Sequence, residues 1–195
     1  MNERMVEYLL SEGVRVVADD VRAATLSRVK PIIRLLLEHG WPINAKSGWY
    51  DPPVLAYVTE DLELTRWFLS QNADPNAQCG IDRTPLSIGI QKGSVAVIEM
   101  LFAHGGTIHC GQLLHWAASR QKDDRLAVVN ILLRKGALLN AIMYENDEDS
   151  FIQREPFGLG TPLHVVPTRF MWPFAIRSSS TEQTLFSGRT SVAIS

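Results

Sequence analysis

The feature that most constrains this chain of 195 residues is an internal repeat with a period of 31 to 33 residues. In each copy, a Gly-like position is followed four residues later by Asn or His. A period of this length indicates a stack of similar units, each packed on its neighbours, rather than a fold around one central core. The phrase occurs as Gly40 to Asn44, Asn72 to Asn76, Gly105 to His109 and Gly136 to Asn140.

Apolar residues precede each Gly-like position by eight, five, four and three residues. These offsets place the apolar side chains on one side of an α-helix, and the Gly is a natural C-terminal stop. The same spacing before Gly13 predicts that the chain opens in the second helix of an incomplete unit. The four complete sets are Ile32, Leu35, Leu36 and Leu37; Leu64, Trp67, Phe68 and Leu69; Val97, Met100, Leu101 and Phe102; and Val128, Ile131, Leu132 and Leu133.

A second phrase precedes these helices, as in Thr84-Pro85-Leu86 and Thr161-Pro162-Leu163. Proline is favoured at the first position of a helix, and the Thr before it can cap the helix. Each unit is therefore expected to contain a turn, a short helix, a loop and a longer helix. The phrase is eroded at Pro52-Pro53-Val54, which predicts weaker capping in that unit.

Together the two phrases resemble the ankyrin repeat, a unit of about 33 residues built from a β-turn finger and two antiparallel helices. The resemblance covers roughly residues 5 to 166 and implies an all-α solenoid of stacked helix-turn-helix units. We predict a half unit over 1–16, units over about 17–44, 45–76, 77–109 and 110–140, an extended finger over 141–160, and the start of a fifth unit over 161–166. Residues 167–195 are predicted to be a degenerate or disordered tail, because prolines interrupt the helical pattern and Ser and Thr make up half of residues 178–195.

The fingers of the last units depart from the common length. The fourth finger is about five residues short, whereas the fifth contains about 13 additional residues. Between Tyr144 and Glu155 this insertion has five acidic residues and one Arg, with aromatic residues among them. That composition suits a basic, partly apolar partner, and the alternative is a mobile linker. The end of the insertion, Phe157 to Pro162, resembles a finger of ankyrin arrays in filamentous fungi.

Charge and composition exclude several classes of function. The 19 Lys and Arg residues are outnumbered by 21 Asp and Glu residues, so no basic excess exists to bind nucleic acid or a membrane surface. We found no apolar run of the roughly 18 residues that a membrane span needs, and no secretory signal. The expected location is the cytoplasm, with the nucleus as the alternative.

The residues that could carry chemistry are better explained by the repeat. The histidines fall on repeated positions, where structural roles are expected, and no Gly-rich phosphate loop or Gly-x-Ser-x-Gly motif is present. The acidic run lacks the Gly and the closing Glu of a calcium loop. A metal site formed by Cys79, His109 and Cys110 is an alternative without a recognisable ligand spacing. We therefore predict no enzyme activity, no cofactor and no metal.

The resemblance implies a monomeric, non-catalytic module that recognises a protein partner through a concave surface of fingers and first helices. Exposed aromatic residues are enriched at interface hot spots, which makes Trp49 and Tyr50 the sharpest candidates, although Trp49 could instead pack on a neighbouring finger. The alternative function is a truncated or decayed fragment of a larger ankyrin-containing receptor or adaptor without independent activity. The predicted contact residues are Lys46, Trp49, Tyr50, Asp51, Gln78, Ile81, Arg83, Gln91, Lys92, Ser119, Arg120, Tyr144 and Phe151.

Overall fold

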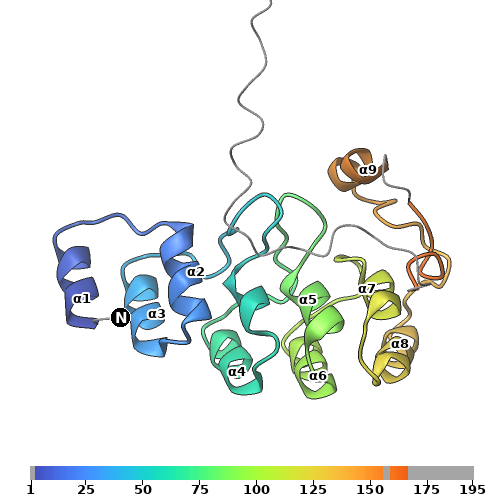
Figure 1. Cartoon of the computed structure of the whole chain (residues 1–195), viewed down its shortest axis with the longest axis horizontal. Coiled ribbons are helices and arrows are strands. Elements are labelled where there is room, and N and C mark those ends of the chain that lie inside the picture. The colour runs from blue at the N-terminus through green and yellow to red at the C-terminus, as the bar shows by residue number, and fades with distance from the viewer. Residues whose placement is uncertain (1–2, 156–158, 167–195) are drawn as a thin grey trace, which may run out of the picture.

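A computed structural model describes residues 3–155 and 159–166, and within these ranges the ordered elements are all helices (Figure 1). The prediction for the tail, residues 167–195, lies outside the described residues. The expected all-α solenoid is confirmed. The helices are α1 (Glu3–Ser11), α2 (Ala18–Leu26), α3 (Lys30–Glu38), the 3₁₀-helix η1 (Val54–Val58), α4 (Leu62–Ser70), α5 (Pro85–Lys92), α6 (Val95–Ala103), α7 (Leu113–Ser119), α8 (Arg125–Arg134) and α9 (Glu148–Arg154).

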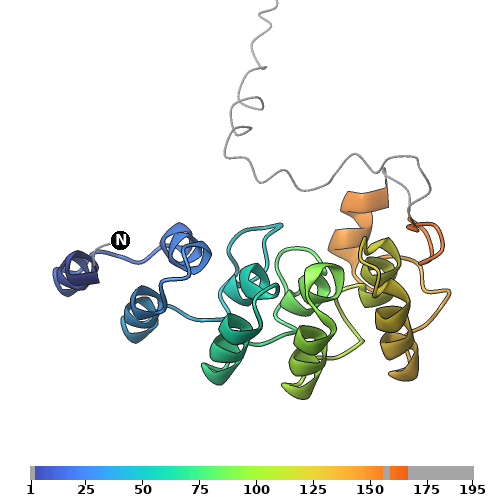
Figure 2. The same cartoon turned by 60° about the horizontal axis from the view of Figure 1, so that its bottom comes forward.

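The helices form two parallel layers that run the length of the solenoid (Figures 1 and 2). The first helices of the units, α2, η1, α5 and α7, pack side by side in one layer. The second helices, α1, α3, α4, α6 and α8, form the other layer, and the fingers project beyond the first. None of the described helices has the length and apolar character that a membrane span requires.

The repeated apolar positions build the core between the layers. The side chains eight and four residues before each Gly-like position are buried in all four units, as in Leu64 with Phe68 and Val97 with Leu101. The positions five and three residues before it are mostly half-buried, because they lie at the edges of the same helix face. The helical interpretation of the pattern is therefore confirmed. Of the four apolar positions in each set, the two that lie eight and four residues before the Gly-like position are the most buried.

Adjacent units are joined by the Asn of the repeat phrase. The Asn44 side chain accepts a hydrogen bond from the Asp74 N–H at 2.8 Å and donates to the Asn72 carbonyl at 3.2 Å. Asn76 makes the equivalent pair with Thr107 and Gly105, both at 2.9 Å. Each Asn thus satisfies backbone groups in the turn of the next unit, which fixes the spacing of the stack.

The two forms of the first-helix phrase have the predicted difference in capping. Thr84 and Ser87 form a reciprocal capping box at the start of α5, each side-chain oxygen accepting from the other residue's backbone N–H at 3.1 Å. By contrast, Pro53 precedes η1 without a side-chain capping bond, and the element is a five-residue 3₁₀-helix.

Candidate functional site

The described part of the fifth unit's insertion, residues 141–155, folds back across the short fourth finger. Its helix α9 reaches the third finger (residues 77–83), where the Ser150 hydroxyl oxygen accepts a hydrogen bond from the Asp82 N–H at 2.7 Å. It also reaches the second finger (residues 45–51), where Gln153 Oε1 accepts from Trp49 Nε1–H and from the Tyr50 hydroxyl, both at 3.3 Å. The inserted segment therefore joins fingers up to 104 residues away in the sequence.

Asp82 is the centre of the hydrogen-bond network beneath α9. Its buried carboxylate accepts from the Gly111 N–H at 2.6 Å, from Gln78 Nε2 at 2.7 Å and from Gln112 Nε2 at 2.5 Å. Gln112 in turn accepts from the Tyr144 N–H at 2.9 Å. The network connects the third finger, the fourth finger and the insertion, and a buried carboxylate with several donors is well satisfied.

Tyr144 and Gln112 adopt left-handed backbone conformations, with φ of 63° and 52°. Such values are uncommon outside glycine, and here the hydrogen bond between these residues holds both turns in place. The Tyr144 side chain is 2% exposed, and its burial raises the pKa of the phenol above its ordinary value. These two turns direct the insertion back over the fourth finger.

Trp49 forms a rigid aromatic platform at the edge of the fingers. Its ring lies over Gly80, so close that a Cβ on that glycine would be 2.4 Å from the ring, and its carbonyl accepts from the Gly80 N–H at 2.7 Å. Even so, Trp49 remains 52% exposed and Tyr50 54% exposed. Trp49 therefore packs on a neighbouring finger, as the alternative interpretation expected, and about half of it still faces solvent.

Four of the predicted contact residues require correction, because their side chains are buried. Ile81 and Tyr144 lie within the finger layer. The buried Arg83 guanidinium lies 5.3 Å from the centre of the Trp116 ring, and desolvation lowers the pKa of Arg83. Arg120 is 0% exposed and bonded to carbonyls of the preceding unit. These side chains support the surface from within and are not available to a partner.

The remaining candidates fall into two groups. One group lies on the fingers and the insertion, where Lys46, Trp49, Tyr50 and Gln78 are exposed and Asp51 and Phe151 are half-buried. The other lies at the C-terminal ends of α5 and α7, where Lys92 is exposed and Gln91 and Ser119 are half-buried. The described contacts bring Trp49 and Tyr50 together with α9. Asp82, Gln112 and Ser150, which organise this edge, were not among the predicted site residues.

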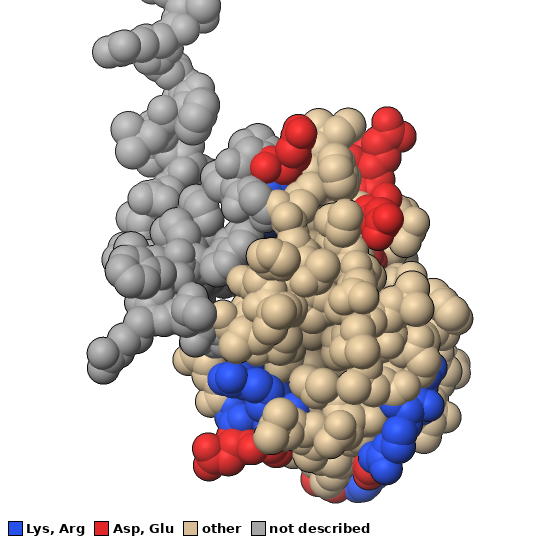
Figure 3. Space-filling model, turned by 90° about the vertical axis from the view of Figure 1, so that its right-hand side faces the viewer, with Lys and Arg blue, Asp and Glu red and all other residues tan. Residues whose placement is uncertain are grey.

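Charge is unevenly distributed around the finger edge. The second finger and residues 141–155 together contain six carboxylates and two basic side chains. In the view onto the end formed by α8 and α9, the charged side chains at the top are mostly acidic, whereas the bottom carries basic side chains with acidic ones beside them (Figure 3). The surface between the top and the bottom of this view is largely uncharged (Figure 3).

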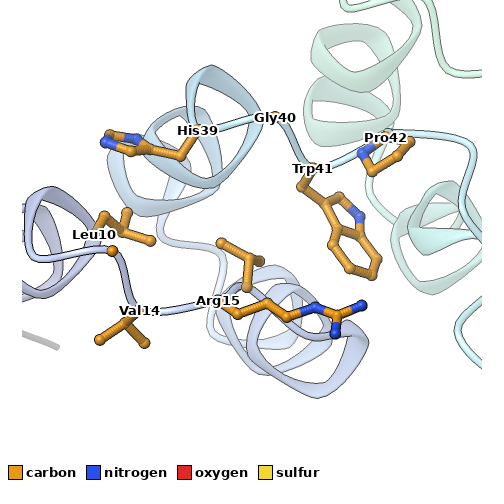
Figure 4. Close-up of a pocket in the computed structure, with 9 residues that line it drawn as sticks. Leu10, Val14, Arg15, His39, Gly40, Trp41 and Pro42 are labelled. Carbon is orange, nitrogen blue, oxygen red and sulfur yellow. The ribbon is translucent and has the colours of Figure 1, made fainter.

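A concave region of about 460 Å³ lies near the N-terminal end of the solenoid, between α1, α2 and α3 (Figure 4). It is lined by apolar side chains such as Leu10 and Trp41, together with Arg15 and His39. The His39 imidazole is engaged with its own helix, since its Nδ1 lies 2.9 Å from the Leu35 carbonyl oxygen. Among the described residues that line this hollow, His39 and Arg15 are the only ones with an ionisable side chain.

Two further histidines of the repeat, His104 and His115, are also engaged in structural bonds. His104 Nδ1 lies 2.9 Å from the Met100 carbonyl, as in the equivalent position of the third helix, and His115 Nε2 lies 3.0 Å from the Gly160 carbonyl. These bonds confirm the structural interpretation of the three residues. Within the described ranges, no three His, Cys, Asp or Glu side chains converge to hold a metal, and Cys79 is buried beside the Ile81 carbonyl.

The first prediction concerns the attachment of α9. In a Ser150→Ala variant the buried Asp82 N–H loses its acceptor, so we expect a loss of about 1 to 3 kcal/mol of unfolding free energy. Hydrogen exchange should accelerate selectively in α9. Ser119→Ala is the matched control, because the Ser119 hydroxyl donates only to its own helix, at Trp116 O. Equal exchange rates for α9 in both variants would contradict this role of Ser150.

Comparison with protein families agrees with the stacked helix pairs of the structure. The family model for ankyrin repeats in many copies matches residues 53–102, and the model for the single ankyrin repeat matches residues 113–144. Residues 53–102 and 113–144 are therefore ankyrin repeats. A search of curated proteins found no match. Ankyrin repeats generally mediate protein–protein interaction, and domains built from them are typically non-catalytic.

Proposed function

We propose that this chain is a non-catalytic module that binds a protein partner through the edge formed by the second finger and α9. We call this edge the aromatic ledge, and it consists of Trp49, Tyr50, Asp149, Ile152 and Gln153. The observation that carries the proposal is the state of the two aromatic side chains, which are half exposed but held in place. An aromatic group that is fixed before binding loses little conformational entropy when a partner covers it.

The Trp49 and Tyr50 side chains are held in place by contacts with the third finger and with α9. The Trp49 ring rests on Gly80, which has no side chain to displace it, and both aromatic polar groups bond to the same Gln153 oxygen. Ile152 on α9 is 61% exposed and adds an apolar surface next to Gln153. Aromatic and apolar groups of this kind, surrounded by polar residues, are characteristic of the central part of protein interfaces.

The second prediction tests the ledge directly. Proximity labelling with the intact chain is compared with a Trp49→Ala, Tyr50→Ala double variant, because this change removes both aromatic surfaces. We expect partners to be lost from the double variant while circular dichroism shows an unchanged helical content. The matched control is Tyr8→Ala with Leu9→Ala, which removes exposed apolar side chains from α1 at the far end of the solenoid.

The comparison with the control decides the outcome. Loss of the same partners in both double variants would indicate a general effect of surface change and would contradict a role specific to the ledge. Retention of all partners in the ledge variant, with the fold intact, would also overturn the proposal.

A further inference from the structure

The aromatic ledge carries carboxylates on the same side as its aromatic groups. On α9, Asp149 precedes Gln153 by four residues and Ile152 by three, so the three side chains share one face of the helix. Gln153 places that face against Trp49 and Tyr50. Asp149 is exposed, and its four-residue spacing from Gln153 places it about one helical turn from the contact with the two aromatic rings.

Not all the acidic residues of the insertion are equally available. Asp147 caps α9 by accepting from the Ser150 N–H at 2.9 Å, and Glu145 accepts from the Ile142 N–H at 3.2 Å. Glu148 and Asp149 are exposed in the first turn of the helix. Of these two exposed carboxylates, Asp149 is the one on the same face of the helix as Gln153, which contacts the aromatic rings.

We infer that the partner presents a basic segment to this ledge, with Arg or Lys side chains interleaved with apolar ones. This inference rests on the proposed function and specifies the chemistry of its partner. A cation over the exposed face of Trp49 or Tyr50 is attracted by the aromatic ring, and a neighbouring carboxylate adds to that attraction. An apolar side chain of the same segment would cover Ile152.

Charge complementarity favours this occupant over the other classes of macromolecule. The six carboxylates and two basic groups of the second finger and residues 141–155 give a local excess of negative charge. Phosphate groups of nucleic acids or anionic lipids would be repelled by that excess. A basic protein segment would be attracted, and the attraction would also increase its rate of association.

The third prediction is tested with defined peptides and the full chain. The probes are fluorescent peptides made of four Arg-Leu-Gly, four Gln-Leu-Gly or four Glu-Leu-Gly repeats. We expect binding in the order Arg, Gln, Glu, and weaker binding of the Arg peptide when salt is raised, because screening reduces the attraction of exposed charges. Equal affinity for the Arg and Glu peptides would overturn the inference.

Variants then locate the binding on the ledge. Asp149→Asn removes one carboxylate, and Trp49→Leu removes the aromatic ring but keeps an apolar side chain. Each should weaken binding of the Arg peptide about two- to fivefold, the range expected for one exposed charge or one cation–π contact. Asp123→Asn is the matched control, because Asp123 is an exposed acid in the loop between α7 and α8, away from the fingers. Equal effects of the two Asp variants would contradict binding at the ledge.

The outcomes separate this inference from the proposed function. If the ledge double variant loses its cellular partners but the chain does not prefer the Arg peptide, the ledge is the binding surface and its partner is not basic. If the chain prefers the Arg peptide but the ledge variants bind it normally, the basic segment binds elsewhere and the inference fails. If the double variant also retains its partners, the proposed function fails.

Discussion

Replacing Arg120 with Met is expected to lower the unfolding free energy by about 3 to 5 kcal/mol, as measured by urea denaturation. The fully buried guanidinium donates to the carbonyls of Ile90 at 2.8 Å and Gly93 at 2.7 Å, which belong to the preceding unit. It also donates to both Asp124 oxygens at 2.6 Å. Methionine fills similar space but leaves these acceptors without donors.

The control and the pH dependence make this prediction specific. Arg134→Met, at the exposed end of α8, should change stability by less than about 0.5 kcal/mol. The hydrogen bond from Arg120 holds the pKa of Asp124 below its ordinary value of 3.8. Stability from this pair is therefore complete above pH 3.8 and is lost as the pH falls through the lower folded-state pKa. A stability difference that stayed constant or grew in acid would contradict the assignment.

Replacing Leu101 with Ala is expected to cost about 2 to 5 kcal/mol, because it leaves a cavity between the helix layers. Leu101 is 0% exposed, and its Cδ1 atom fills the space beside Gly89, where a Cβ would lie 2.6 Å away. The two residues therefore fit each other across α5 and α6. The midpoint of urea denaturation should fall substantially in this variant.

The matched control for Leu101 lies in the same helix. Glu99 is exposed, so Glu99→Ala removes a side chain of α6 without changing the core, and a change below about 0.5 kcal/mol is expected. Similar losses of stability in the two variants would show that the helix faces, and hence the repeat register, are assigned incorrectly.

The periodic part of this structure was predictable from sequence, because the repeat fixes which side chains are buried. Positions such as Val97 and Leu101 recur with the same offsets in every unit, and the structure buries them in every unit. The Thr84 cap and the eroded phrase at Pro53 were also interpreted correctly, since capping depends on a few neighbouring residues. Buried positions could thus be predicted from the repetition, and helix caps from the neighbouring residues.

The candidate site was less predictable, because it depends on contacts between distant units. The sequence pointed to the exposed aromatic pair Trp49 and Tyr50, but it gave no indication that Gln153 would bond to both. Arg120 was assigned to the surface from its position after the first helix, whereas the carbonyls of the preceding unit surround it.

The helix in the insertion did leave a local signal. Asp147 followed by Ser150, with two further acids between them, is the pattern of a capped helix start, and Asp147 does accept from the Ser150 N–H. The composition of the acidic run predicted a contact for a basic partner or a mobile linker, and neither prediction included a helix. No local pattern could predict where α9 packs, because its contacts are with the second and third fingers, three and two units earlier in the chain.

The fold-back of the insertion changes how this solenoid is expected to unfold. In a repeat array with contacts only between neighbours, terminal units can detach while the rest stays folded. Here the bonds from α9 to Asp82 and Trp49 span 68 and 104 residues. Separation of α9 from the array would break these bonds to the second and third fingers. We therefore expect the segment from the second unit to the fifth to unfold as one cooperative block. We also expect the last step of folding to be slow, because closing contacts between residues so far apart in the sequence costs conformational entropy.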